Sequence, residues 1–210
     1  HGHILATPKP GWSRYDFAGA LAEGLSVPVA VETDVNAAAL AEAQARDEAG
    51  SLAYMTVGTG IGVGLVIDGR CVHGAAHPEM GHYYPRRPVE DVEFKGVCPF
   101  HGDCLEGLAG GPAISARWGA TLSDLPPTHP AHHRVAGYLA QACHTLFAST
   151  SVETVVLGGG VLETPNLRER IAARTRELDA GYLPGGTRHT IVAPRLGSRS
   201  GIIGAMILAP

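Results

Sequence analysis

Four residues that could bind one metal ion lie between positions 82 and 104: His82, Cys98, His101 and Cys104. Two thiolates and two imidazoles suit a tetrahedral Zn²⁺, and the Cys-x-x-His-x-x-Cys spacing lets one tight loop supply three of the four ligands. The alternative is a chance grouping of surface histidines and buried cysteines, since the chain has 11 His. The regular interval of three residues favours the metal site. Four protein ligands leave no open position for water, so a structural ion is predicted rather than a catalytic one.

A carboxylate, Asp34, follows an apolar run at 27–31 that is bounded by turn residues and predicts a buried strand. An Ala-rich helix is predicted from 36 to 49. Open α/β sheets place ligand sites at the carboxyl end of a buried strand, ahead of the next helix. The simpler interpretation is that Asp34 or Asn36 only caps that helix. Position alone does not separate the two.

A glycine-rich segment, Gly58-Thr59-Gly60-Ile61-Gly62-Val63-Gly64, lies between predicted strands at 51–57 and 65–70. Glycines let the backbone close on a phosphate, to which a Thr hydroxyl and backbone N–H groups can donate. It is neither a P-loop, because no Gly-Lys-Ser/Thr follows, nor a dinucleotide fingerprint, because a strand and not a helix comes next. A tight hairpin with a bulge remains the alternative.

A second glycine-rich turn, Gly158-Gly159-Gly160-Val161, follows a predicted buried strand at 154–157 and precedes a predicted helix at 166–180. This order again fits a nucleotide site at the edge of a sheet.

The remaining pattern is that of an α/β chain, with elements in the order β-α-β-β, an insert, helices, and β-α-β-α. The insert at 85–102 has no regular periodicity and is expected to need metal to hold it, and residues 122–133, with three Pro and three His, are expected to form an exposed loop. The other predicted elements are helices at 16–24, from 104, from 110 to Trp118, at 134–150 (the longest) and at 201–208, and a strand at 191–193.

The composition limits the classes of function. The 210 residues are 45% hydrophobic with a net charge of −4 and no run of Lys or Arg, which argues against a nucleic-acid partner or a polybasic membrane anchor. No apolar run approaches the ~20 residues of a membrane span, and the first residues do not form a signal peptide, so a cytoplasmic protein is expected. Cys71 and Cys143 are predicted to be free, buried thiols, with a disulfide between them as the alternative.

Five motifs together resemble the ROK family (repressor, open reading frame, kinase), and within it the zinc-containing bacterial fructokinases. They occur in the family's order along nearly the whole chain: Glu32-Thr33-Asp34-Val35-Asn36, Gly58 to Gly64, His77-Pro78-Glu79-Met80-Gly81-His82, Cys98-Pro99-Phe100-His101-Gly102-Asp103-Cys104-Leu105-Glu106, and Leu157-Gly158-Gly159-Gly160-Val161.

The resemblance implies two actin-like, ribonuclease-H-like lobes around a cleft. Residues 1–35 would be a remnant of the small N-terminal lobe, and residues 36–210 the large lobe, including the zinc loop 82–104. Family kinases begin with an Asp-x-Gly-Gly-Thr-type loop that holds Mg²⁺ and the β- and γ-phosphates. This sequence lacks that loop, so the chain is expected to represent a kinase without its first third and to be inactive alone.

The resemblance also implies an activity, the ATP-dependent phosphorylation of a hexose. The expected reaction converts D-fructose to fructose 6-phosphate, with ATP, Mg²⁺ and a structural Zn²⁺. Asp34 would be the general base that takes the proton of the attacking hydroxyl. The sugar would be held by Thr33, Asn36, Glu79, His82 and Glu106, the nucleotide by Gly58, Thr59, Gly60, Gly111, Pro112, Gly158, Gly159, Gly160 and Val161, and zinc by His82, Cys98, His101 and Cys104.

Two departures from glucokinase-type relatives point to the fructokinase branch. Thr33 stands where those relatives carry Asn, and His101 stands in a loop where they carry a third Cys. A kinase for mannose or another hexose, a sugar-responsive transcriptional repressor and a non-catalytic sugar-binding protein remain alternatives. A homodimer is expected, and the apolar stripe of the 134–150 helix could belong to its interface or to the core.

Overall fold

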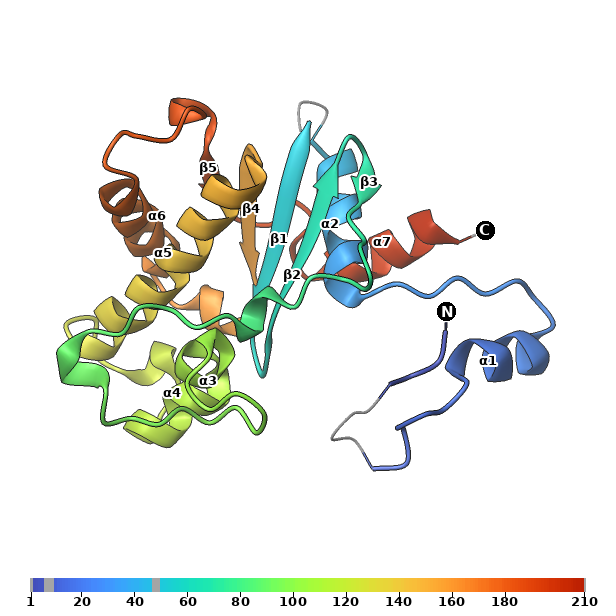
Figure 1. Ribbon diagram of the computed structural model, residues 1–210, viewed down its shortest axis with the longest axis horizontal. Helices are drawn as coiled ribbons and strands as arrows, with labels where there is room; N and C mark the ends of the chain where they lie inside the picture. The colour runs from blue at the N-terminus through green and yellow to red at the C-terminus, as the bar shows by residue number, and fades with distance from the viewer. Residues whose placement is uncertain (1, 6–9, 47–49, 210) are drawn as a thin grey trace.

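A five-stranded mixed sheet forms the centre of the fold (Figure 1). The computed structural model describes residues 2–5, 10–46 and 50–209. The strand order is β3-β2-β1-β4-β5, in which β1 pairs antiparallel with β2 and parallel with β4. The strands are β1 (Ser51–Val57), β2 (Ile61–Ile67), β3 (Arg70–Cys71), β4 (Thr154–Gly158) and β5 (Thr190–Val192). The predicted α/β class is confirmed.

Helices cover both faces of the sheet, as the alternation of side chains along the strands requires. Ala53, Met55 and Val57 of β1 face a core shared with α5 (Pro130–Thr150) and α6 (Leu167–Asp179). Leu52 and Tyr54 face the other side, where α2 (Asp34–Gln44) and α7 (Ser200–Leu208) pack against each other (Figure 1). No helix in the described ranges is long and apolar enough to cross a bilayer.

The longest helix, α5, begins four residues earlier than predicted. Pro130 occupies its first turn, and His129 Nδ1 accepts a hydrogen bond from the Ala131 N–H at 3.2 Å. The prediction of an exposed loop at 122–133 is therefore wrong at both ends. The last residues belong to α5, and Leu122 at the start is buried. Residues along the stripe of α5, such as Leu139 and Leu146, are fully buried in the core. The stripe is core, so it gives no support to the expected homodimer, which stays a prediction.

The predicted buried strand at 27–31 is wrong. These residues belong to no strand, and the side chains of Val27 and Val31 are 50% and 51% exposed. The segment connects α1 (Phe17–Leu25), which has no buried residue, to α2, and it has no neighbouring strand with which to form a ladder (Figure 1). An apolar run becomes a strand only where its N–H and C=O groups find such a partner. The proposed boundary between lobes at residue 35 stays a prediction.

A long insert runs from β3 to α3 (Leu105–Ala109) and contains the turns η1 (Met80–His82) and η2 (Val89–Asp91). The carboxylate of Asp91 is buried and pairs with the guanidinium groups of Arg117 and Arg134, with Arg134 Nη1 2.7 Å from Oδ1. The Tyr138 hydroxyl donates to the same carboxylate. These contacts attach the insert to α4 (Gly111–Trp118) and α5 without a metal ion, which the sequence analysis did not anticipate.

The remaining short elements are η3 (Leu122–Asp124), η4 (Gly160–Glu163), η5 (Gly186–Arg188) and η6 (Gly197–Arg199). All four cysteines are free, which confirms that Cys71 and Cys143 are not paired with each other. Cys143 is fully buried, and burial raises the pKa of its thiol to about 12, whereas Cys71 is only half-buried.

Candidate active site

A hollow of about 360 Å³ lies at the carboxyl end of β1, where the β1–β2 hairpin turns. It is lined by side chains from four separate segments, among them Asp34 at the start of α2, Glu79, His82 beside η1, and Glu106 in α3. Chain positions up to 72 residues apart, from Asp34 to Glu106, thus meet at one place. We refer to this hollow as the acidic pocket. The family resemblance predicts that these four residues act together, and the fold brings all four to one pocket.

The first turn of α2 determines where Asp34 points. Thr33 caps the helix, with its Oγ1 accepting a hydrogen bond from the Asn36 N–H at 3.1 Å. Asp34 is the first helical residue; its Oδ1 accepts from the Val35 N–H at 2.9 Å, and the side chain is exposed to the acidic pocket. Neither Asp34 nor Asn36 is the cap, so capping does not account for the carboxylate of Asp34.

Thr33 and Asn36 do not line the acidic pocket, although both were expected to contact substrate. Residues two apart on an α-helix point about 200° away from each other, so Asn36 faces the sheet while Asp34 faces the pocket. Asn36 is fully buried: its Nδ2 donates to Glu32 Oε1 at 2.9 Å and its Oδ1 accepts from the Leu65 N–H at 3.3 Å. The expected substrate contact of Asn36 is therefore corrected to an internal one.

The Gly58-Thr59-Gly60 turn is held from two sides. The Gly111 N–H at the start of α4 donates to the Gly58 carbonyl at 2.7 Å. On the other side, Glu106 Oε2 accepts from the Ile61 N–H at 2.9 Å, and a Cβ on Gly60 would lie 2.8 Å from the same oxygen. A side chain at position 60 would therefore require the Glu106 carboxylate to shift. Glu106 thus joins the metal-ligand loop to the glycine turn.

A second, larger hollow of about 660 Å³ lies on the far side of this turn. It shares Gly58 and Thr59 with the acidic pocket, and it is lined by the predicted residues Gly111, Pro112, Gly160 and Val161. The predicted residues Gly60, Gly158 and Gly159 do not line it. Gly159 packs against β1 instead: its φ is +94°, and a Cβ there would lie 2.5 Å from the Val57 carbonyl oxygen. Sequence reasoning missed the polar lining residues Ser115, Thr121, Ser123 and Thr164.

These missed hydroxyls come from segments without a recognisable motif. Ser123 Oγ and Thr164 Oγ1 lie 3.4 Å apart although they are 41 positions apart in the chain. Only the packing of η3 against η4 brings them together. The only signal in the sequence was the glycine-rich turn that precedes a helix. It indicated Gly160 and Val161, but not the hydroxyl-bearing residues on the opposite wall of the hollow.

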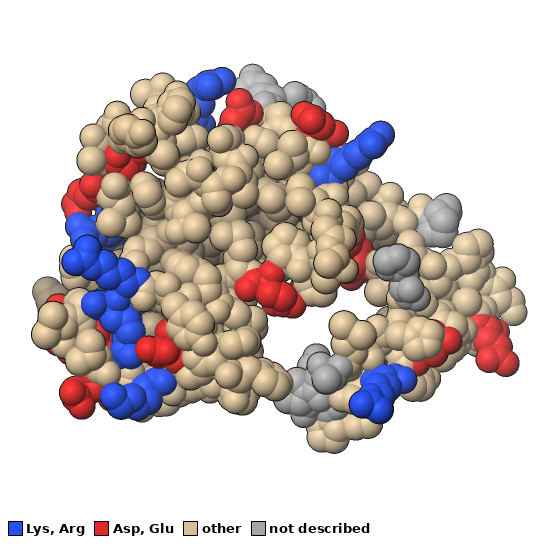
Figure 2. Space-filling view, in the orientation of Figure 1, with Lys and Arg blue, Asp and Glu red and all other residues tan. Residues whose placement is uncertain are grey.

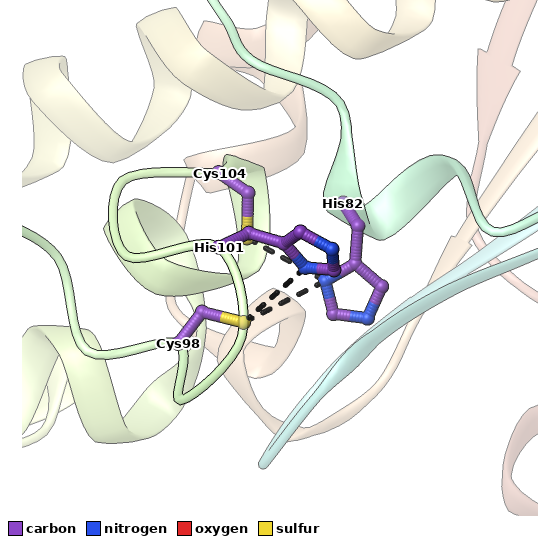
Figure 3. Close-up of side chains that lie close together, drawn as sticks. All are labelled: His82, Cys98, His101 and Cys104. Atoms are coloured by element: carbon purple, nitrogen blue, oxygen red, sulfur yellow. Dashed lines mark hydrogen bonds between the residues drawn. The ribbon is translucent and has the colours of Figure 1, made fainter. Parts of the chain in front are cut away.

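The four predicted metal ligands converge with their donor atoms within 4.8 Å of one another (Figure 3). His82 Nδ1 lies 3.5 Å from Cys104 Sγ and 3.8 Å from Cys98 Sγ, and His101 Nδ1 lies 3.8 Å from Cys98 Sγ. Tetrahedral bonds of about 2.3 Å to sulfur and 2.0–2.1 Å to nitrogen separate the S and N ligands by about 3.5 Å. The donor set and its spacing therefore fit zinc.

The loop that carries three of these ligands is closed by its own backbone. Cys98 and Gly102 exchange N–H···O=C hydrogen bonds of 3.2 and 2.9 Å. Cys98 and Cys104 are buried, and His101 lies at the exposed rim. Burial raises the pKa of the Cys104 thiol to about 11, so a thiolate at this position needs a cation beside it.

Charged side chains are unevenly distributed over one face of the molecule (Figure 2). On the face shown in Figure 2, Lys and Arg gather along one edge with Asp and Glu among them, and most of the face carries neither.

Comparison with known proteins places this geometry in a family. The ROK family model matches residues 1–210. The chain belongs to the ROK family. It is 43% identical to the fructokinase of Zymomonas mobilis over 213 residues, covering 99% of this chain and 71% of that protein. It is 39% identical to the fructokinase of Pediococcus pentosaceus over 217 residues, covering 100% of this chain and 73% of that protein.

A solved structure confirms the expected fold. The ROK hexokinase from Thermus thermophilus superposes with a TM-score of 0.79 at 29% identity, covering 99% of this chain and 74% of that one. The mixed sheet flanked by helices on both faces is thus the actin-like α/β fold of the ROK sugar kinases. Within that ROK fold, the acidic pocket and the second hollow lie on either side of the glycine turn.

Proposed function

We propose that this ROK chain carries the sugar and nucleotide sites of an ATP-dependent hexose kinase. One observation carries the proposal: a carboxylate-lined pocket and a larger hydroxyl-lined hollow meet at the two faces of the same glycine turn. A kinase needs two adjoining sites, because the acceptor hydroxyl must reach the γ-phosphorus in line with the leaving oxygen of ADP. Relatives that are named fructokinases support the reaction type.

In the proposed reaction the sugar hydroxyl oxygen attacks the γ-phosphorus of ATP. The bond between that phosphorus and the β-γ bridging oxygen breaks, ADP leaves, and the hydroxyl proton passes to a carboxylate oxygen of Asp34. Asp34 suits this role because it is exposed in the acidic pocket and its Oδ1 is held by the hydrogen bond from the Val35 N–H. It would both orient the hydroxyl and accept the proton.

Three further side chains would hold the sugar. Glu106 uses Oε2 for the Ile61 N–H, which leaves Oε1 to accept from a sugar hydroxyl. His82 directs Nδ1 toward the cysteine sulfurs, so Nε2 remains for the substrate (Figure 3). Glu79 lies at the exposed rim, paired with His77 at 2.8 Å. Hydroxyls of a hexose are well matched to such acceptors and donors.

Zn²⁺ held by His82, Cys98, His101 and Cys104 would supply a fixed cross-link between η1 and the loop before α3. The His82 ring would then be locked in orientation, and Glu106, two residues after Cys104, would be fixed with it. The proton transfer itself needs only Asp34 and the substrate.

ATP, entering with Mg²⁺, would occupy the second hollow. The Gly58-Thr59-Gly60 turn would lie against its phosphates, with Thr59 and the Gly60 N–H as donors, since the Gly58 N–H already donates to the Gly60 carbonyl. The Gly158–Val161 turn, through Gly160 and Val161, would border the adenosine together with Gly111 and Pro112. Thr121, Ser123 and Thr164 add hydroxyls that the ribose or base could use. We propose D-fructose as the acceptor and fructose 6-phosphate as the product, in line with the names of the relatives.

The test is a coupled phosphorylation assay on the full-length protein with ATP and Mg²⁺, offering fructose, mannose, glucose and N-acetylmannosamine side by side. Asp34→Asn should abolish turnover and leave sugar binding measurable. Asp68→Asn is the matched control, because Asp68 is exposed in the β2–β3 turn at φ 51°, which Asn adopts equally well. Sugar binding without turnover on any of the four would favour a repressor or sensor. Turnover on mannose alone would correct the substrate.

A further inference from the structure

Behind Asp34 lies a buried polar network that the proposed chemistry does not use. Its centre is Asn36, fully buried on the sheet side of α2 among alanines. A buried amide destabilises a fold unless it is hydrogen-bonded, and an alanine would suit this position without that requirement. The Asn36 amide is satisfied on both ends, by Glu32 Oε1 at 2.9 Å and the Leu65 N–H at 3.3 Å.

Glu32 collects the other contacts of the network. Its Oε1 also accepts from the Thr33 N–H at 2.8 Å, and its Oε2 lies 2.6 Å from His73 Nε2. The side chain is only 14% exposed. Burial raises the pKa of Glu32, but the hydrogen bonds from Thr33, Asn36 and His73 outweigh it and leave the pKa below its ordinary value. Glu32 is therefore an ionised acceptor held by three donors from two segments, the start of α2 and the residues after β3.

The network surrounds Asp34 along the chain, with Glu32 two residues before it and Asn36 two residues after it. Asn36 anchors the following side to Leu65 in β2, the strand that continues from the glycine turn. Glu32 anchors the preceding side to His73, just beyond β3. The backbone of Asp34 is thereby fixed relative to the turn that would hold the γ-phosphate.

We propose that Glu32 and Asn36 are positioning residues that set the Asp34 carboxylate against the Gly58–Gly60 turn. The proposal rests on the kinase function proposed above. His73 is the outer member: its side chain is 51% exposed, so water can replace its contact and its removal should matter less. Neither Glu32 nor Asn36 touches the acidic pocket, so their loss should alter the rate of phosphoryl transfer more than the affinity for either substrate.

The test compares Asn36→Asp, Glu32→Gln and the double variant in the full-length protein. Asn36→Asp keeps the shape but turns a donor into an acceptor that faces Glu32. We expect kcat to fall by about 30- to 100-fold, since misplacing a reacting group by about 1 Å costs on the order of 10²-fold, while KM for sugar and ATP changes less than about threefold. In the double variant a Gln amide can donate to the new carboxylate, so kcat should recover about tenfold. Asn166→Asp, the same change at an exposed position, should be neutral.

Hydrogen exchange of the 33–37 amides gives a readout that does not depend on turnover. The exchange rate should rise in Asn36→Asp and return to the wild-type value in the double variant. If Asn36→Asp had the wild-type kcat and exchange rate, the positioning role would be overturned. A loss of kcat that the double variant does not recover would overturn it as well. If the wild-type protein turned over no sugar, the kinase proposal would fail, and the exchange data alone would still decide whether Glu32 and Asn36 hold this turn.

Discussion

Replacing Gly64 by Ala should displace the proposed base without touching it. Gly64 lies in β2 where α2 crosses at close range, and a Cβ there would lie 2.0 Å from the Val35 carbonyl oxygen and 2.6 Å from the Asn36 nitrogen. Both obstacles are backbone atoms, so no side-chain rotation relieves them. A real Cβ keeps at least 3.0 Å, so β2 and the first turn of α2 must move apart by at least 1.0 Å, the difference between 3.0 and 2.0 Å.

Asp34 directly precedes Val35 and would move with it. We expect kcat to fall about 100-fold, because about 1 Å of misplacement costs roughly that factor. Overpacking of this kind costs about 1–3 kcal/mol, which corresponds to a fall in Tm of roughly 2–12 °C for a chain of this size.

The assay is steady-state kinetics together with thermal denaturation followed by circular dichroism. Gly137→Ala is the control: it lies inside α5 with nothing within 4 Å of the added Cβ, and should gain about 0.5–1 kcal/mol. A folded Gly64→Ala protein with wild-type kcat and Tm would refute the reasoning.

Three further predictions concern parts of the fold outside the α2–β2 contact. Cys98→Ala should lower bound zinc measured by elemental analysis and speed hydrogen exchange at 98–104, while the segment around Asp91 stays protected; equal loss of protection in both would contradict this. Asp91→Asn should cost about 3–5 kcal/mol in urea denaturation, because Arg117 and Arg134, whose side chains are only 14% and 19% exposed, lose their charged partner; a loss under 1 kcal/mol would contradict it. Glu42 is fully buried, and burial raises the pKa of its carboxyl. The hydrogen bonds that Glu42 accepts from Ser200, Arg46 and the loop at 195–196 outweigh this effect and leave the pKa below its ordinary value of 4.5. Its stabilisation is present above pH 4.5 and lost as the pH falls through the lowered value, so Glu42→Gln should be less stable at pH 7 and show a weaker acid dependence than wild type.

Much of the site could be predicted because its residues sit in short motifs whose chemistry is local. A Cys-x-x-His-x-x-Cys run can close on one ion by itself, and the structure brings His82 to it as expected. A Gly-Thr-Gly turn between two strands is a hairpin whatever surrounds it. The acidic pocket forms because the fold brings the segments that carry Asp34 and Glu106 to the same place, beside the turn between β1 and β2.

The failures share a cause, which is dependence on partners far away in the chain. The run at 27–31 has strand composition but no neighbouring strand, so its valines stay exposed. No motif in the sequence marks Asp91; its carboxylate pairs with Arg117 and Arg134, which are 26 and 43 positions later. Asn36 could have been assigned correctly from helical periodicity, because it lies on the side of α2 opposite Asp34.

The parallel pairing of β1 with β4 has a consequence for how the protein is made. Leu52 pairs with Thr154, 102 positions later, whereas β1 and β2 pair across a three-residue turn. On a ribosome, every residue of the acidic pocket is synthesised by position 106, but the second hollow waits for Gly160 and Thr164. Until β4 arrives, the apolar edge of β1 has open N–H and C=O groups, the kind of edge that invites aggregation. The nascent chain therefore passes through a stage in which the hairpin can form but one side of its first strand is uncovered, and chaperone dependence should be greatest for chains arrested between residues 106 and 154.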